Sequence, residues 1–213
     1  LKVAVPASTG QALQAFGFVI INTFILAYGP AVSAAYYIGN RINSLVMFPV
    51  SAVSSILAIY IAQNVGANNI PRAKAAFRTC MTIAVSLMTV GALLIIPFRM
   101  SLVSIFNNTD QETIKYAAEY TLFLHLGLPL MGIFQTYLSA FQGSGDTKYS
   151  FVMALIRLWV LRIPMVLAFK YFTNLGPLGV WYAMLISNIL IVFVGYYLYS
   201  KVRFLPKIKS VAA

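Results

Sequence analysis

Residues 3–40 read VAVPASTGQALQAFGFVIINTFILAYGPAVSAAYYIGN, a run of 38 residues without a charged side chain. Two further stretches, residues 42–71 and 171–200, are each 30 residues long and also lack charge. A helix needs roughly 20 apolar residues to cross the hydrocarbon core of a bilayer. With 61% hydrophobic residues among 213, a soluble fold would lack the polar surface that water requires. The chain is therefore predicted to be a polytopic membrane protein.

The apolar runs predict six membrane-spanning helices, separated by turn residues such as Gly29-Pro30 and Asn107-Asn108. Backbone groups in hydrocarbon must bond to one another, so continuous runs of this length form helices. The predicted spans are residues 3–27, 31–62, 75–96, 116–140, 151–168 and 178–199. We therefore predict an all-α fold with residues 1–213 as a single transmembrane domain. The second run is expected to tilt, to kink at Pro49 or to begin outside the bilayer.

Basic residues gather on one side of the predicted spans. That side holds Lys2, Arg72, Lys74, Arg78, Lys148, Lys201, Arg203, Lys207 and Lys209, whereas the other side holds Arg99, Lys115 and Lys170. The positive-inside rule then places both ends in the cytoplasm, in agreement with an even number of spans. The net charge of +11 indicates contact with anionic lipid headgroups. It does not indicate nucleic acid, which binds basic residues concentrated on a soluble face.

The segment between the third and fourth spans carries a second apolar feature. Residues 102–106 are expected to form a short helix lying at the outer membrane surface, or to be part of a capped loop. Thr109 or Asp110 is expected to cap the fourth span. The single cysteine, Cys80, excludes a disulfide within the chain and a cysteine metal cluster, and we predict no metal site.

Polar and aromatic side chains recur at helical spacing in three of the spans. These stripes indicate either hydrogen bonding between helices or a wet cavity, since such groups are costly against lipid. A cavity of amides and aromatic rings would suit broad, weakly directional recognition. The candidate cavity residues are Gln11, Gln14, Phe18, Asn22, Tyr36, Asn40, Asn43 and Gln135.

The ionisable groups predicted at membrane depth are basic. Arg41 and Arg157 are expected to extend toward the interface. Arg162 lies near mid-span and needs a partner, which would be a helix carbonyl, a lipid phosphate or an acid from outside the chain. His125, the only histidine, is either a proton-binding residue or a neutral group bonded to a neighbouring helix. We regard His125 and Arg162 as candidate proton-binding or gating residues.

Several motifs, in this order along the chain, resemble the C-terminal six-helix half of a multidrug and toxic-compound extrusion (MATE) transporter. No single motif is diagnostic, but together they cover nearly the whole chain. The motifs are residues 34–42 (AAYYIGNRI), 63–67 (QNVGA) with Arg72, Phe106 and Asp110 leading into 117–120 (AAEY), 143–147 (GSGDT) and 157–164 (RLWVLRIP).

The resemblance implies one lobe of a two-lobed, alternating-access exporter of amphipathic, often cationic compounds in a bacterial inner membrane. It implies exchange against H⁺ or Na⁺, no cofactor, and an N-terminal lobe of the same polypeptide as partner. The chain begins at Leu1 without a leader, so we expect that it begins inside a longer protein, or is processed or trimmed. Since the first and fourth spans carry no acid in their bodies, we expect the coupling carboxylate in the missing lobe.

Three functions are alternatives to drug export. A lipid-linked or polysaccharide flippase of the same superfamily would use Arg41, Arg157 and Arg162 to meet a phosphate. A membrane enzyme lacks support, because the chain has no His-Glu-x-x-His or Gly-x-Ser-x-Gly motif and only 4 acids. A purely structural membrane subunit is the alternative from a different class.

Overall fold

The computed structural model describes residues 4–107 and 110–202, with side chains from residue 12 onward. Within these ranges the fold is all-α, as predicted, and no strand is present. The helices are α1 (Ala4–Leu26), α2 (Pro30–Gly66), α3 (Ile70–Phe106), α4 (Gln111–Leu126), α5 (Leu128–Gly143), α6 (Thr147–Leu155), the π-helix η1 (Ile156–Arg162), α7 (Ile163–Phe172) and α8 (Pro177–Lys201).

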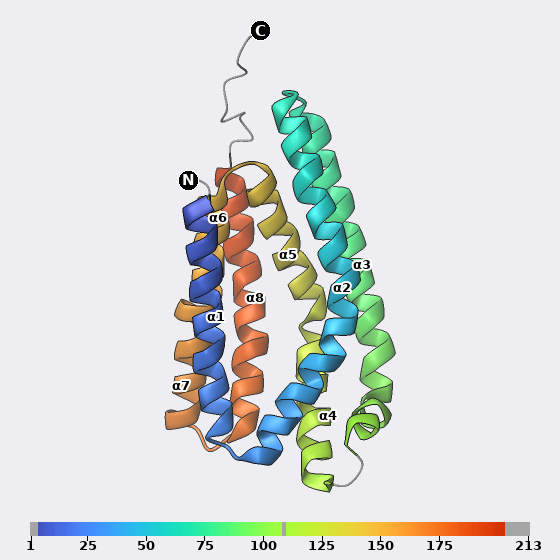
Figure 1. The fold of residues 1–213 in the computed structure, drawn as a ribbon, viewed down its shortest axis with the longest axis vertical. Helices are drawn as coiled ribbons and strands as arrows, with labels where there is room; N and C mark the ends of the chain where they lie inside the picture. The colour runs from blue at the N-terminus through green and yellow to red at the C-terminus, as the bar shows by residue number, and fades with distance from the viewer. Residues whose placement is uncertain (1–3, 108–109, 203–213) are drawn as a thin grey trace.

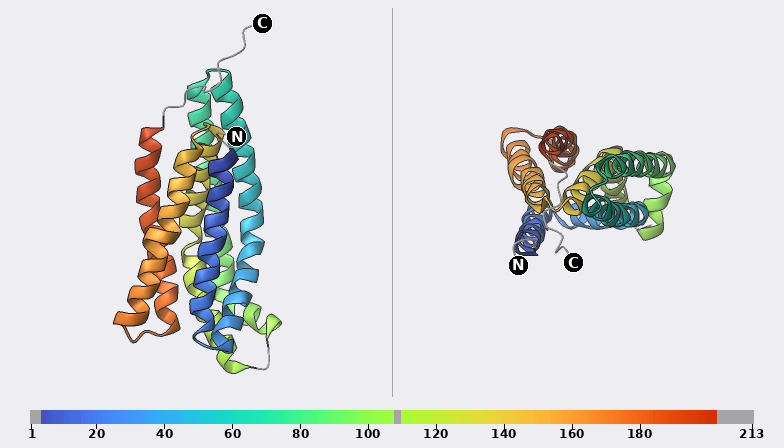
Figure 2. Two further views of the ribbon diagram at one scale, coloured as in Figure 1. Left: turned by 60° about the vertical axis from the view of Figure 1, so that its left-hand side comes forward. Right: turned by 90° about the horizontal axis from the view of Figure 1, so that it is seen from above.

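Two groups of helices make up the bundle (Figures 1 and 2). One group contains α2 to α5, and the other contains α1, the continuous α6–η1–α7 helix and α8. The start of α1, the end of α8, the α2–α3 turn and the α5–α6 turn lie at the same end of the molecule (Figure 1). This end therefore carries Arg72, Lys74, Lys148 and Lys201.

The outer faces of the helices suit lipid. Large apolar side chains such as Phe48, Ile105 and Phe172 are 72%, 76% and 87% exposed, an arrangement that water would disfavour. By length and apolar composition α2, α3, the α6–α7 helix and α8 can each cross a membrane, and the bent pair α4–α5 provides a fifth crossing. The part of α1 with described side chains, Ala12–Leu26, is apolar but shorter. Together they correspond to six spans.

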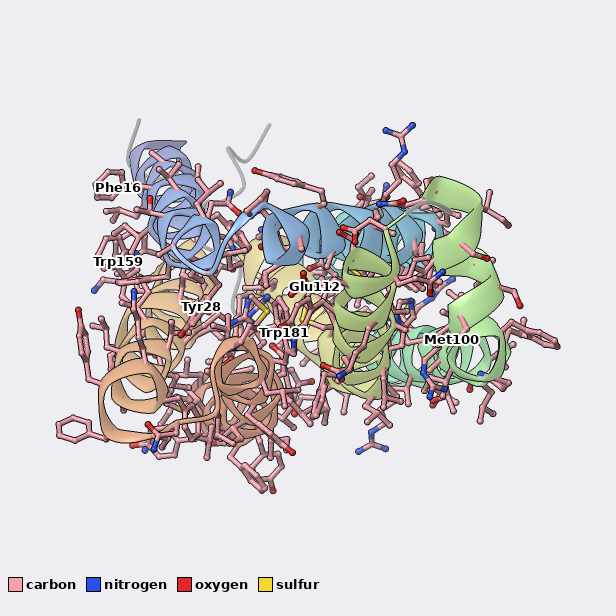
Figure 3. All side chains as sticks on the ribbon, turned by 90° about the horizontal axis from the view of Figure 1, so that it is seen from below. Phe16, Tyr28, Met100, Glu112, Trp159 and Trp181 are labelled. Atoms are coloured by element: carbon pink, nitrogen blue, oxygen red, sulfur yellow. The ribbon has the colours of Figure 1, made fainter. Side chains whose placement is uncertain are left out.

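Residues 102–106 are helical, but they form the end of α3 and not a helix of their own. Their place at the outer membrane surface stays a prediction. Backbone hydrogen bonding continues through α3 to Phe106, and the amide of Asn107 still donates to the carbonyl of Val103 at 3.1 Å. Pro97 lies inside this helix, and the last turns of α3 swing across the bundle axis (Figures 2 and 3). A proline removes one backbone hydrogen bond and can bend a helix without ending it.

Asp110 caps α4, and Thr109 lies outside the described residues. The Asp110 carboxylate accepts hydrogen bonds from the amide of Glu112, at 3.1 Å, and from the hydroxyl of Thr113. The hydrogen bond from Thr113 is the main reason why the pKa of Asp110 lies below its ordinary value. The cap fixes the start of α4 by satisfying an amide that has no partner within the helix.

The fourth predicted span, residues 116–140, is broken near its middle. The chain bends by 50° between α4 and α5 at Gly127. Pro129 follows in the first turn of α5, and its ring nitrogen cannot donate to the carbonyl four residues earlier. The bend lies where Pro129 interrupts the backbone hydrogen bonds, and it divides the polar stripe of this span between two helices.

Close packing between α2 and α4 depends on Gly39. A Cβ atom at this position would overlap the ring of Tyr120. The ring cannot move aside easily, since Tyr120 is 2% exposed and lies against Trp181, with ring centroids 4.3 Å apart. Glycine at this position therefore lets the two helices approach within ring contact.

We predict that Gly39→Ala lowers the free energy of unfolding by about 1–3 kcal/mol, the usual cost of overpacking a filled core. Thermal unfolding of the detergent-solubilised protein measures this effect. Gly66→Ala is the matched control, because a Cβ atom there meets nothing within 4 Å. Equal stability of the two variants would contradict this account of the α2–α4 contact.

Candidate functional site

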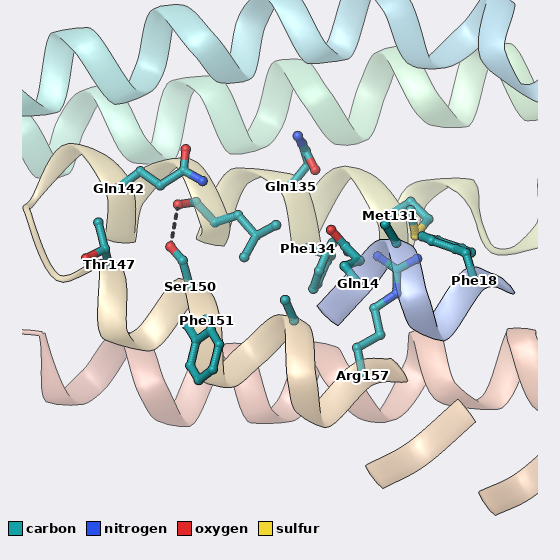
Figure 4. Close-up of a pocket in the computed structure, with 13 residues that line it drawn as sticks. Gln14, Phe18, Met131, Phe134, Gln135, Gln142, Thr147, Ser150, Phe151 and Arg157 are labelled. Atoms are coloured by element: carbon teal, nitrogen blue, oxygen red, sulfur yellow. Dashed lines mark hydrogen bonds between the residues drawn. The ribbon is translucent and has the colours of Figure 1, made fainter. Parts of the chain in front are cut away.

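A cavity of about 750 Å³ lies between α1, α5 and α6 and reaches the first turn of η1 (Figure 4). It extends from the α5–α6 turn, near Gln142 and Thr147, to the middle of the bundle at Arg157. The residues that line it are Gln14, Ala15, Phe18, Met131, Phe134, Gln135, Leu138, Gln142, Thr147, Ser150, Phe151, Ala154 and Arg157.

The lining combines apolar and neutral polar groups with a single charge. Three amides, three phenylalanine rings and two hydroxyls face the same space. Arg157 is the only charged side chain among the described residues that line it, and none of them is a carboxylate. Such a site offers donors, acceptors and ring faces, together with one cation.

Side-chain contacts hold α1 against η1 at one wall of the cavity. The indole nitrogen of Trp159 donates to the carbonyl of Leu13 at 3.2 Å, and the Trp159 ring stacks on Phe16 with centroids 5.9 Å apart (Figure 3). Gly17 allows this approach, since a Cβ atom there would overlap the side chain of Leu158. These contacts place Gln14 and Phe18 beside the cavity.

The opposite wall is fixed by the α5–α6 pair. The hydroxyl of Ser150 on α6 donates to the carbonyl of Leu138 on α5 at 3.2 Å (Figure 4). A polar group buried between membrane helices gains stability from such a bond. The bond sets the separation of the two helices, and with it the width of the cavity near the α5–α6 turn.

Contrary to the expectation, the side chain of Arg157 does not extend to the membrane interface. Its side chain is 6% exposed, and the guanidinium carbon lies 4.3 Å from the ring centroid of Phe134. The seven-residue π-helix η1 begins one residue earlier, at Ile156. A π segment inside an α-helix widens the turn and often accompanies a functional site. Here it carries both buried arginines, Arg157 and Arg162.

Arg162 bonds to two side chains of this chain. Neither is a helix carbonyl, a lipid phosphate or an acid from outside the chain, which were the partners expected. Its Nε donates to the hydroxyl of Ser187 at 3.0 Å, and its Nη2 donates to Oδ1 of Asn188 at 2.8 Å. Both partners lie on α8. Two uncharged side chains therefore accept hydrogen bonds from the guanidinium, and Arg162 joins η1 to α8. Its role as a gating residue remains a prediction.

Tyr36 and Asn40 belong to a different cluster, which does not line the cavity. The hydroxyl of Tyr120 donates to Oδ1 of Asn40 at 3.2 Å, and the Asn40 amide donates to the carbonyl of Tyr36 at 2.9 Å. The Tyr36 ring lies parallel to that of Trp181, with centroids 6.4 Å apart. This cluster joins α2, α4 and α8 in the core.

His125 lies just before the α4–α5 bend and is fully buried. Its Nδ1 is 2.7 Å from the carbonyl of Thr121, whereas Nε2 is buried without a hydrogen-bond partner. The Oδ1 atoms of Asn22 and Asn43 are also buried without partners. None of these three residues lines the cavity, and their roles remain predictions.

The predicted stripes thus separate in the structure. Gln14, Phe18 and Gln135 come together in the cavity, while the side chain of Gln11 lies outside the described residues. The sequence reasoning missed the α6 wall, including Ser150 and Phe151. The polar residues of this helix are consecutive at its start, residues 147–150, so they show no stripe at helical spacing. Among the residues with described side chains, no group of three His, Cys, Asp or Glu could hold a metal ion.

Comparison with known proteins places these features in a family. The family model MatE matches residues 6–167. The probable multidrug resistance protein YoeA of Bacillus subtilis is 28% identical over 199 residues, which make up 92% of this chain and 43% of that protein. A FAD transporter of Shewanella oneidensis is 27% identical over 200 residues, covering 94% of this chain and 44% of that protein.

Solved structures show the same fold. A crystal structure of MATE in the bent conformation matches with a TM-score of 0.86 at 20% identity, over 94% of this chain and 44% of that one. The crystal structure of the Vibrio cholerae MATE transporter VcmN in the bent form matches with a TM-score of 0.85 at 20% identity. The match covers 93% of this chain and 45% of that one. The chain spans less than half the length of the relatives that it matches. Since the family model covers most of its residues, the chain belongs to the MATE family.

Proposed function

We propose that the chain forms one lobe of a secondary active efflux transporter, which exports amphipathic, often cationic small molecules by alternating access. The observation that carries the proposal is the cavity between α1, α5 and α6. Its volume of about 750 Å³ falls within the range of drug-sized ligand sites, and amides and aromatic rings line it together. The similarity to the probable multidrug resistance protein YoeA supports this assignment.

The second lobe would belong to the same natural polypeptide. The relatives are more than twice as long as the matched part of this chain, which supports a transporter of two such lobes. We place the cavity on the side that faces the cleft between them. A purely structural subunit would have no need for a cavity of this size and polarity.

The arginines favour drug export over the flippase alternative. Arg41 is exposed on α2, and Arg162 is already bonded to Ser187 and Asn188. Of the three arginines that would meet a phosphate, only Arg157 lines the cavity. A polyanionic headgroup would need more than one such contact.

We predict that Phe18→Ala slows ethidium efflux about fivefold, because an aromatic contact contributes about 1 kcal/mol. Efflux is followed by fluorescence in pump-deficient bacteria that express the natural polypeptide. Val19→Ala is the matched control, since this neighbouring residue is 58% exposed and does not line the cavity. If the unmodified protein leaves ethidium accumulation unchanged, the proposed efflux function is wrong.

Export would be driven by H⁺ or Na⁺, and we place the coupling carboxylate in the other lobe. No acid lines the cavity described here. We predict that neutral Asn or Gln substitution of the intramembrane acids of the other lobe abolishes ion-driven efflux in membrane vesicles. Undiminished efflux would contradict this placement and make His125, whose Nε2 is buried without a partner, the leading candidate. His125→Gln would then test its role.

We also propose that the end carrying the α2–α3 and α5–α6 turns faces the cytoplasm. It carries Arg72, Lys74, Lys148 and Lys201, whereas the other end carries Arg99, Lys115 and Lys170. In a Cys80→Ala background, Gln111→Cys should react with a membrane-impermeant maleimide in intact cells. Ala67→Cys should react only after permeabilisation. Both positions are exposed in the structure, so the reverse pattern of labelling would show the opposite orientation.

A further inference from the structure

The side chain of Arg157 stands out among the buried polar groups of the molecule. It is 6% exposed, lines the cavity and points into it beside Phe134 and Gln14 (Figure 4). Its guanidinium makes no hydrogen bond to the described part of the chain, and it lies over the Phe134 ring, 4.3 Å from the ring centroid. A buried cation without a counter-charge is costly in a medium of low dielectric constant.

Arg162 provides an internal comparison on the same π-helix. Two N–H groups of its guanidinium donate to Ser187 and Asn188, so this side chain is held within the fold. Arg157 lies five residues earlier, and its donors remain available to a molecule in the cavity. The positive charge of Arg162 nearby adds to the field that an anion would meet at Arg157.

We propose that Arg157 binds the acidic group, a carboxylate or a phosphate, of an aromatic amphipathic substrate. A guanidinium presents a planar fork of N–H donors that fits such a group through two parallel hydrogen bonds. The Phe134 ring covers one face of the fork and holds it in place. This inference rests on the proposed transport function and adds a substrate class to it.

The rest of the lining fits the remainder of such a molecule. Phe18 and Phe151 offer ring faces to an aromatic body, and the amides of Gln14 and Gln135 offer neutral donors and acceptors. A second, cationic end of the substrate would find no carboxylate here, and would therefore lie toward the other lobe. Both free acids and zwitterions belong to the proposed class.

A matched pair of dyes tests the proposal by binding. The probes are a rhodamine with a free benzoate group and the methyl ester of the same dye, which differ only in the acidic group. Their affinities for the purified natural protein in detergent are measured by fluorescence anisotropy. We expect the acid to bind about tenfold more tightly than the ester, the typical contribution of a charge-assisted hydrogen bond.

In the Arg157→Gln variant, we expect acid binding to weaken about tenfold and ester binding to change less than about twofold. Arg157→Lys should restore part of the preference, because it keeps the charge without the planar fork. Arg41→Gln removes one positive charge from an exposed position and should change neither affinity. Equal affinity of the unmodified protein for both dyes, or equal loss of both in Arg157→Gln, would overturn the proposal.

Further readouts separate the sources of failure. If Arg157→Gln does not fold, two measurements on the unmodified protein still test the proposal. The first is its preference for the acid dye over the ester, and the second is the loss of this preference when naphthyl phosphate competes for the site. Stronger competition by phosphatidylglycerol in the micelles would identify a lipid headgroup as the source of the acidic group. Ethidium efflux without acid preference overturns this inference alone. Acid preference without ion-driven efflux overturns the proposed transport function alone.

Discussion

The structure depends on one constraint, which is that a polar group inside a bilayer must find a partner within the protein or in a wet cavity. Most of the polar residues inside these helices obey it locally. The hydroxyls of Ser51, Thr89 and Thr136 each donate to the carbonyl four residues earlier. Such bonds leave the helix faces apolar. Arg157, which makes no hydrogen bond to the described part of the chain, instead lines the cavity.

Two arginines five residues apart on one helix illustrate both outcomes. Arg162 uses its donors to hold η1 against Ser187 and Asn188 of α8. Arg157 has only the face of Phe134 and opens into the cavity. The same side chain is therefore a structural link at one position and an available cation at the other. The π-helix that contains both residues connects the α8 interface to the cavity.

Hydrophobic run length and turn residues are sufficient to predict the all-α fold, since a span must both cross the bilayer and satisfy its own backbone. They do not show where α4 bends at Gly127, because the effect of Pro129 depends on packing around it. The stripes included Gln14, Phe18 and Gln135, which the structure brings to one cavity, and their role in binding a substrate stays a prediction. The stripes did not show that Tyr36 and Asn40 belong to a different cluster from these three residues. Helical spacing shows which residues share a face of one helix, but it does not show which helices pack together.

The central claim is that the cavity between α1, α5 and α6 receives the substrate with its acidic group at Arg157. A cryo-electron microscopy map of the natural protein with the free-acid dye bound tests it most directly. The account predicts dye density in the cavity, with the benzoate about 3 Å from the guanidinium and the rings against Phe18 or Phe134. Dye density elsewhere, for example beside Tyr36 and Trp181, would contradict it.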